Sequence, residues 1–225
     1  GYYGRATDRL YGRVTRLFMN PLLRALKSVL GPLPPLEYLE SFRYPLAGEI
    51  ALDVDLVRRI RIPHDWAFEV GTLSEVMRNC APRAICQSEL CEVYDHKHQE
   101  LSIRDPEKGL NKMAVDIARS FFQRMAAEGI KLDTGLFDTL LSAYSRQAED
   151  TLRFYAADAE LNGLTYPRHE EEMAVSMFVR SICGAAQSFQ EDPLWSPLIS
   201  NWNRVESALR DFLDKLREAV RLDNE

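Results

Sequence analysis

A segment with two histidines, Asp95-His96-Lys97-His98-Gln99, carries side chains suited to holding a divalent metal ion. Imidazole is a common ligand for such ions. Because His96 and His98 are two residues apart, both point to one side in an extended segment but not in a helix. A full metal site needs other ligands, and no HxxxH or HExxH pattern supplies them nearby. The segment therefore predicts either a metal site or two surface histidines.

The segment Gly12-Arg13-Val14-Thr15 offers groups that suit an anionic ligand. The Arg13 guanidinium is a planar set of donors that matches phosphate or carboxylate, and Thr15 adds a hydroxyl. Gly12 permits close approach of the backbone, and a nearby helix N-terminus favours negative charge. The alternative is a glycine within an amphipathic helix that also carries an exposed arginine.

A third candidate is Glu69, a carboxylate in the apolar stretch 66–70 just before Gly71. A carboxylate there is either a helix N-terminal cap or an acceptor of two hydrogen bonds from sugar hydroxyls. Glu49 ends a similar loop, Tyr44-Pro45-Leu46-Ala47-Gly48-Glu49. Neither glutamate by itself identifies a reaction.

The segment Asp53-Val54-Asp55 has the Asp-x-Asp form of a nucleotide-sugar metal site. Apolar residues at 52, 54, 56 and 57 indicate instead the start of a helix, with Asp53 as its N-cap. We interpret the segment as a helix start and not as a metal site.

The elements that position these residues are a helix at the start of the chain and then a section of mixed helices and strands. A helix is predicted over 8–30, interrupted where Asn20 caps a second helix that has Pro21 in its first turn. Between 37 and 99, short apolar runs indicate an α/β sheet with helices at 54–60 and 71–78 and strands at 84–86 and 90–94.

From about residue 110 onward the apolar spacing predicts only helices, at 110–125, 134–162, 168–190 and 197–222. Ser196 and Pro197 are expected to start the last one. Its predicted buried face consists of Trp202, Val205, Leu209, Phe212, Leu213, Leu216 and Val220.

The composition limits the classes of partner. A net charge of -6 over 225 residues argues against a general nucleic-acid or anionic-membrane surface. No apolar run approaches the roughly 20 residues that span a bilayer. The spacings of the four cysteines (Cys80, Cys86, Cys91 and Cys183) match neither metal pairs nor a disulfide framework, which predicts reduced thiols and a cytoplasmic location.

Taken together, these motifs resemble those of glucosyl-3-phosphoglycerate synthases. Gly12-Arg13-Val14-Thr15, followed by Pro21-Leu22-Leu23, is similar to their acceptor segment, and Pro45 to Glu49 to their Pro-Leu-Gly-Gly-Glu loop. Phe68-Glu69-Val70-Gly71 resembles their Val-Glu-Ile-Gly, and Val93 to His98 the segment with their metal-binding histidine. The matches run from about residue 5 to about residue 102, and mannosyl-3-phosphoglycerate and mannosylglycerate synthases share much of the pattern.

The resemblance implies an α/β fold class: the C-terminal part of a GT-A glycosyltransferase fold followed by a mostly helical tail. Residues 1–105 would bind the acceptor and complete the metal site, and residues 106–225 would form the helical region. The implied reaction moves glucose from a nucleoside diphosphate glucose to 3-phosphoglycerate with retention at the anomeric carbon. A divalent metal, Mg²⁺ or Mn²⁺, and a homodimer are implied as well.

Four residues would bind the acceptor if the resemblance holds. Gly12, Arg13 and Thr15 match the family's site for the phosphate and carboxylate end of 3-phosphoglycerate. His98 stands where some relatives have an asparagine near the acceptor, and a protonated imidazole there can bond to phosphate.

The remaining implied residues serve the transferred sugar and the metal. Leu46 would line the acceptor and sugar site through its backbone, and Glu69 would hold the sugar hydroxyls. His96 would complete the metal site beside the donor diphosphate. Ala47 replaces the first glycine of the family's loop, a mild change if its φ is negative.

Family members carry a nucleotide-binding half, with the true Asp-x-Asp, before the Gly-Arg-Val-Thr segment. Without those carboxylates His96 has too few partners to hold a metal tightly. We therefore expect the 225 residues alone to transfer no sugar.

Other functions remain open from the sequence. The donor can be a mannose nucleotide instead. A different class is a non-catalytic helical module for dimerisation or interaction. A metal-dependent phosphoester hydrolase built on His96 and His98 lacks the carboxylate-rich pattern of two-metal sites.

Overall fold

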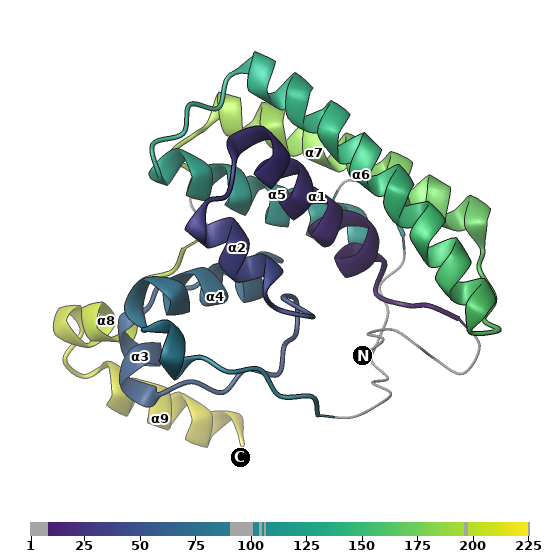
Figure 1. The fold of residues 1–225 in the computed structure, drawn as a ribbon. Helices are drawn as coiled ribbons and strands as arrows, with labels where there is room; N and C mark the ends of the chain where they lie inside the picture. Colours follow the sequence, from purple (N-terminus) through teal and green to yellow (C-terminus); the bar gives the residue numbers. More distant parts are fainter. Residues whose placement is uncertain (1–8, 91–100, 104, 106, 196–197, 225) are drawn as a thin grey trace.

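The structure, a computed structural model, describes residues 9–90, 101–103, 105, 107–195 and 198–224 of the chain (Figure 1). Within these residues the regular structure is helical. Strand-like pairing is limited to two isolated bridges, Arg9 with Thr165 and Pro63 with Leu198. None of the helices in this part of the chain is both long and apolar enough to cross a membrane.

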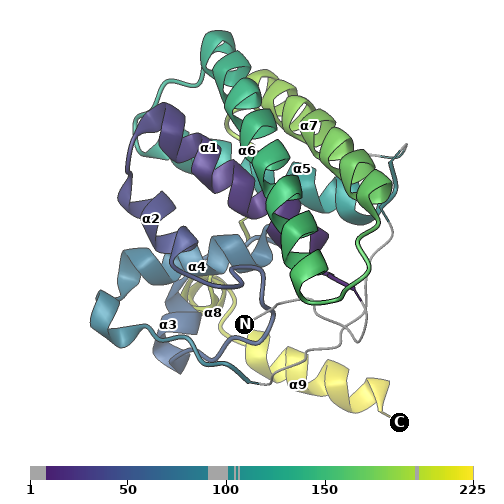
Figure 2. The same ribbon diagram turned by 45° about the vertical axis from the view of Figure 1, so that its right-hand side comes forward.

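Four long helices form the main body. They are α1 (Asn20–Leu30), α5 (Gly109–Ala127), α6 (Thr134–Leu161) and α7 (Arg168–Glu191). Helices α6 and α7 run side by side in both views, joined by a turn in which Gly163 has a φ of +64° (Figures 1 and 2). Their apolar faces meet in one core, as the amphipathic spacing of the sequence requires.

A short π-helix, η1 (Val14–Met19), leads directly into α1 and is buried along its whole length. Phe18 lies fully buried between the rings of Phe178 and Tyr144. This contact anchors the first segment of the chain against α6 and α7.

Asn20 does not cap a new helix, which corrects the interruption predicted there. Its backbone is helical (φ -65°, ψ -46°), and its N–H donates to the Thr15 carbonyl. Pro21 does stand in the first turn of α1, as predicted. Proline cannot donate to the carbonyl four residues before it, that of Leu17, and the Tyr144 hydroxyl donates to this carbonyl instead (2.7 Å). A tertiary contact thus lets the helix continue past the proline.

The smaller helices cover one end of this body in Figure 1. They are α2 (Pro34–Glu40), α3 (Val54–Arg59), α4 (Phe68–Asn79) and the 3₁₀ turn η2 (Pro82–Ala84). Helix α4 starts three residues before the predicted 71. Asp53 caps α3 as predicted, because its side chain accepts hydrogen bonds from the backbone N–H groups of residues 55 and 56 at 2.9 and 3.2 Å.

The strand predicted at 84–86 is wrong. Pro82 fixes the start of a 3₁₀ turn there, and residues 85–90 have no regular structure. An isolated apolar run needs a neighbouring strand to become a ladder, and none lies beside it among the described residues. Residues 91–94 of the other predicted strand lie outside the described part. The described part of the chain therefore contains no β-sheet, although the α/β fold class predicts one.

The helix predicted over 197–222 is also wrong in its extent. It divides into α8 (Trp202–Ala208) and α9 (Phe212–Asp223), which fold back so that the rings of Trp202 and Phe212 lie 5.6 Å apart. Its predicted buried face is not buried: Leu209 is 51% exposed, and Leu213, Leu216 and Val220 are exposed as well. Ser196 and Pro197 lie outside the described residues.

One core cluster draws buried side chains from both sides of the domain boundary predicted between 105 and 106, including Leu26 and Val70 as well as Ile117 and Phe178. The division into 1–105 and 106–225 stays a prediction. Cys80, Cys86 and Cys183 are free thiols, and Cys91 lies outside the described residues.

Gly71 allows α4 to pack closely against Pro63. A methyl group added at Gly71 would overlap the ring of Pro63, which leaves no room for a side chain. We expect Gly71→Ala to lower the free energy of unfolding by about 1–2 kcal/mol, the lower part of the range for overpacking, since one methyl is added. Chemical denaturation measures this. Gly48→Ala is the matched control, because no atom lies within 4 Å of the added group, and an equal loss in both variants would contradict the packing explanation.

Candidate functional site

Five of the seven residues proposed for the site from sequence line one cavity of about 550 Å³. They are Gly12, Arg13, Thr15, Leu46 and Glu69. They come from three separate segments: the start of η1, the loop after α2 and the first turn of α4. Tyr44, Trp66, Met113 and Glu170 contribute to the same wall. The fold thus collects the predicted residues at a single place.

Gly12 turns the chain into the first helix. Its φ is +68°, a left-handed conformation that residues with a side chain rarely adopt. Its carbonyl accepts the first helical hydrogen bond, from the N–H of Arg16 at 2.9 Å. The glycine therefore lies at the helix start and not within an amphipathic helix.

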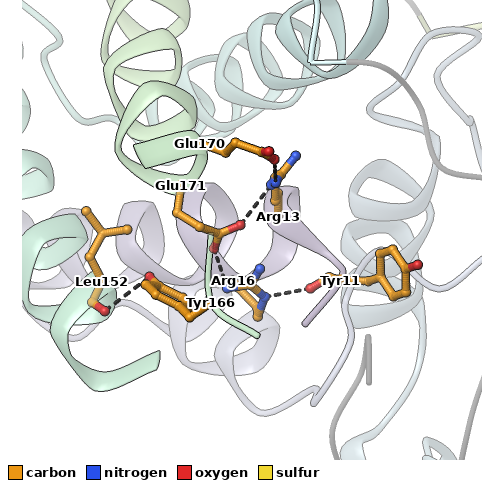
Figure 3. A network of polar contacts seen from close by, with 7 residues as sticks. All are labelled: Tyr11, Arg13, Arg16, Leu152, Tyr166, Glu170 and Glu171. Atoms are coloured by element: carbon orange, nitrogen blue, oxygen red, sulfur yellow. Dashed lines mark hydrogen bonds and ion pairs between the residues drawn. The ribbon is translucent and has the colours of Figure 1, made fainter. Parts of the chain in front are cut away.

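Arg13 is held by two neighbouring carboxylates at the start of α7 (Figure 3). Its Nε donates to Glu171 at 2.8 Å, and its Nη2 donates to Glu170 at 2.6 Å. Burial by itself would lower the pKa of Arg13, but the hydrogen bonds to Glu171 and Glu170 raise it, and the result lies above the ordinary value. The guanidinium therefore stays charged and its orientation is fixed.

Behind Arg13 lies a buried ion pair between Glu171 and Arg16 (Figure 3). The side chains are 1% and 5% exposed, and Glu171 Oε2 lies 2.9 Å from Arg16 Nη1. Arg16 Nε also donates to the Tyr11 carbonyl at 2.5 Å. The Arg16 guanidinium stacks over the ring of Tyr155, 4.7 Å from its centre.

Arg16, Glu170 and Glu171 were not predicted for the site. One signal could have revealed Arg16: it is a charged residue between Val14 and Leu17, on the buried side of an apolar helix. Such a charge needs a buried partner of opposite sign. Nothing in the sequence says that the partner lies 155 positions away, in the run Glu170-Glu171-Glu172.

Thr15 carries a buried hydroxyl at the edge of the cavity. The residue is 4% exposed, and its Oγ1 has no hydrogen-bond partner among the described residues. A buried hydroxyl without a partner is unfavourable. Because the residue lines the cavity, this hydroxyl lies near the space beside Arg13.

Glu69 is the second residue of α4 and is half-buried. The helix N-cap is Ala67, so Glu69 does not serve as the cap. Burial raises the pKa of the Glu69 carboxyl, an effect that its own backbone N–H partly offsets. No ion pair to this carboxylate is formed by the described residues. Its position in the cavity wall suits an acceptor for ligand hydroxyls.

Ala47, in the loop that contains Leu46, does not have the positive φ that favours glycine. Within the described ranges only Ser102 combines a side chain with a positive φ, so Ala47 replaces the family's glycine without strain. Leu46 is partly buried against the main core and lines the cavity.

The two histidines lie outside the described residues, so the metal role of His96 and the acceptor role of His98 stay predictions. The described part of the chain contains no group of three or more His, Cys, Asp or Glu side chains arranged to hold a metal ion. The residues around the cavity therefore do not make a metal site by themselves.

Glu69→Gln tests whether the Glu69 carboxylate is held at an energetic cost. The pKa of Glu69 is raised in the folded protein, so the fold disfavours the ionised form. This cost is complete above the folded pKa and vanishes below the unfolded pKa of about 4.3. We expect the variant to be more stable than the wild type at neutral pH and equally stable below about pH 4, measured by urea denaturation across pH. Glu149→Gln, on an exposed part of α6, should show no such pH-dependent gain.

Comparison with known proteins extends the similarity to the whole chain. It is 46% identical over 224 residues to the glucosyl-3-phosphoglycerate synthase of Persephonella marina, covering 100% of this chain and 55% of that relative. It is 43% identical over 228 residues to the glucosyl-3-phosphoglycerate synthase of Methanococcoides burtonii, covering 99% of this chain and again 55% of the relative. The resemblance inferred from the motifs is confirmed, and the chain spans about half the length of these relatives. No family model matches the chain, and no solved structure matches it.

Proposed function

We propose that this chain is the acceptor-binding part of a retaining glycosyltransferase that moves glucose from a nucleoside diphosphate glucose to 3-phosphoglycerate. One observation carries the proposal: Gly12, Arg13, Thr15, Leu46 and Glu69, which the motifs assign to acceptor and sugar, line the same cavity. The similarity to two synthases over the whole chain supports it.

In this proposal, Arg13 and Thr15 bind the charged end of the acceptor. The guanidinium offers a charged, oriented set of donors, and the Thr15 hydroxyl has no other partner among the described residues. Gly12 gives the backbone its turn beside them. Glu69, which lines the same cavity, accepts hydrogen bonds from the hydroxyls of the glucose. The chain's contribution is then to position two substrates, which by itself can supply a large part of a rate enhancement.

We further propose the GT-A fold for the complete enzyme, a divalent metal and a cytoplasmic location. The metal rests on His96 alone, and none of the roles assigned to the cavity residues depends on it. Same-face attack of the acceptor hydroxyl, assisted by the leaving phosphate, is the mechanism that we adopt for the transfer.

Product analysis tests the proposal. The full-length gene product that contains this chain is incubated with 3-phosphoglycerate or with glycerate as the acceptor, and each acceptor is combined in turn with UDP-glucose, GDP-glucose or GDP-mannose. We expect a glucosyl-3-phosphoglycerate product from a glucose donor. A product formed only from GDP-mannose would make the protein a mannosyl-3-phosphoglycerate synthase, and transfer to unphosphorylated glycerate instead would indicate a mannosylglycerate synthase-like activity. No transfer to either acceptor would overturn the proposal.

A second role, in assembly, is favoured by one observation. The apolar side chains of α8 and α9 that were expected to be buried are exposed in this part of the chain, among them Leu209, Leu216 and Val220. We propose that these helices contribute to a homodimer. Sedimentation before and after deletion of 194–225 tests this: loss of a dimer supports it, and an unchanged state contradicts it.

A further inference from the structure

Arg13 is bound by two adjacent carboxylates that differ sharply in burial. The side chain of Glu171 is 1% exposed, and that of Glu170 is 62% exposed. Both bond to the same guanidinium, at 2.8 and 2.6 Å. The two glutamates are neighbours at the start of α7, and they differ in whether the side chain points into the protein or toward solvent (Figure 3).

Glu171 is fixed in place. Its two oxygens lie between Arg13 and Arg16, and Arg16 is itself held by the Tyr11 carbonyl and the Tyr155 ring. Removing this carboxylate from its position would leave the buried Arg16 without a counter-charge, which is unfavourable. Glu171 therefore remains bound to Arg13 whatever else the guanidinium contacts.

Glu170 can leave. It lines the cavity together with Arg13, and its carboxylate is open to solvent. An exposed ion pair of this kind adds little net stability because water solvates both partners well. Rotation of the side chain away from the cavity frees the Nη2 donor of Arg13 for another oxyanion.

We propose that Glu170 occupies, in the ligand-free protein, the place on Arg13 that the anionic group of the acceptor takes, and that it thereby sets a threshold of charge for acceptors. Glu171 is the positioning residue that keeps the guanidinium aimed while this exchange occurs. The inference rests on the proposed function, because it takes the acceptor to be a phosphorylated acid.

The charges explain the threshold. With both glutamates in place, two guanidinium groups, those of Arg13 and Arg16, face two carboxylates, and the cluster has no net charge. When Glu170 leaves, one positive charge remains uncompensated. A dianionic phosphate gains more from that charge than the monoanionic carboxylate that it replaces, whereas an unphosphorylated acid such as glycerate merely exchanges one carboxylate for another.

The test is calorimetric titration of the full-length gene product with 3-phosphoglycerate, inorganic phosphate and glycerate. We expect Glu170→Gln to tighten binding of 3-phosphoglycerate by about two- to five-fold, the scale of an exposed ion pair, and to make glycerate binding measurable or tighter. Glu172→Gln is the matched control. It removes the same charge two residues away, where Glu172 pairs with Arg168 at 2.8 Å and does not line the cavity, and it should leave all three affinities unchanged.

Glu171→Gln should act in the opposite direction and weaken 3-phosphoglycerate binding, with thermal unfolding used to confirm that the variant is folded. Glu170→Asp, which keeps the charge, should bind like the wild type and not like Glu170→Gln. Unchanged or weaker binding by Glu170→Gln, or equal gains for Glu170→Gln and Glu172→Gln, would overturn the inference alone. If the wild type binds neither 3-phosphoglycerate nor phosphate, the proposed acceptor site fails, and the inference fails with it.

Discussion

Replacement of Glu171 by alanine is expected to lower the free energy of unfolding by about 3–5 kcal/mol. The side chain is 1% exposed and is the counter-charge of Arg16, which is 5% exposed. Its removal leaves a guanidinium buried without its counter-charge, and Arg16 Nη2 has no hydrogen-bond acceptor among the described residues even in the wild type. Urea denaturation of the purified variant measures the loss.

The neighbouring glutamate provides the control for this change. Glu172 is exposed and pairs with Arg168 one turn along α7, so Glu172→Ala should cost less than about 1 kcal/mol. A double variant, Arg16→Leu with Glu171→Leu, should be more stable than Glu171→Ala, because it leaves no uncompensated charge at Arg16. A cost below about 1 kcal/mol for Glu171→Ala would contradict the buried ion pair.

Arg13→Ala is expected to weaken binding of 3-phosphoglycerate by about 1.5–3 kcal/mol, roughly ten- to 150-fold. The variant loses the charge-assisted hydrogen bonds that only the guanidinium fork supplies. Arg13→Lys should recover part of the affinity, since the ammonium keeps the charge but not the planar set of donors. Affinity for the sugar donor should stay near that of the wild type. Calorimetric titration with each substrate separates the two effects.

Two controls guard the interpretation of this result. Arg24→Ala removes an arginine that is 54% exposed on α1, away from the cavity, and should leave both affinities unchanged. Because Glu171 keeps Arg16 as its partner when Arg13 is lost, Arg13→Ala should stay folded, which thermal unfolding checks. Equal losses for acceptor and donor would indicate a general disturbance of the fold and not the loss of an acceptor contact.

Much of the helical structure was predictable because it depends on local spacing. The ranges predicted for α5, α6 and α7 agree with the observed Gly109–Ala127, Thr134–Leu161 and Arg168–Glu191 to within two residues at each end. The cap at Asp53 was predictable for the same reason, because a carboxylate reaches the backbone N–H groups two and three residues ahead without any tertiary contact. The residue types proposed for the site also came from the sequence.

Tertiary contacts decided the features that the sequence left open or led us to predict wrongly. The continuous helix past Pro21 depends on a hydroxyl from Tyr144. The 84–86 run has no neighbouring strand to pair with in the described part of the chain, and Leu209, Leu216 and Val220 remain exposed there. In each case the outcome depends on what lies beside the segment in space, which local spacing does not encode.

The site shows the same division. The sequence determined that Gly12, Arg13 and Thr15 could bind an anion, because donor geometry and charge are properties of residue types. Only the fold decided that Glu69 lines the same cavity as these residues and that two glutamates more than 150 residues away already hold the guanidinium. Buried charges must find partners, but which partner they find depends on how the helices pack.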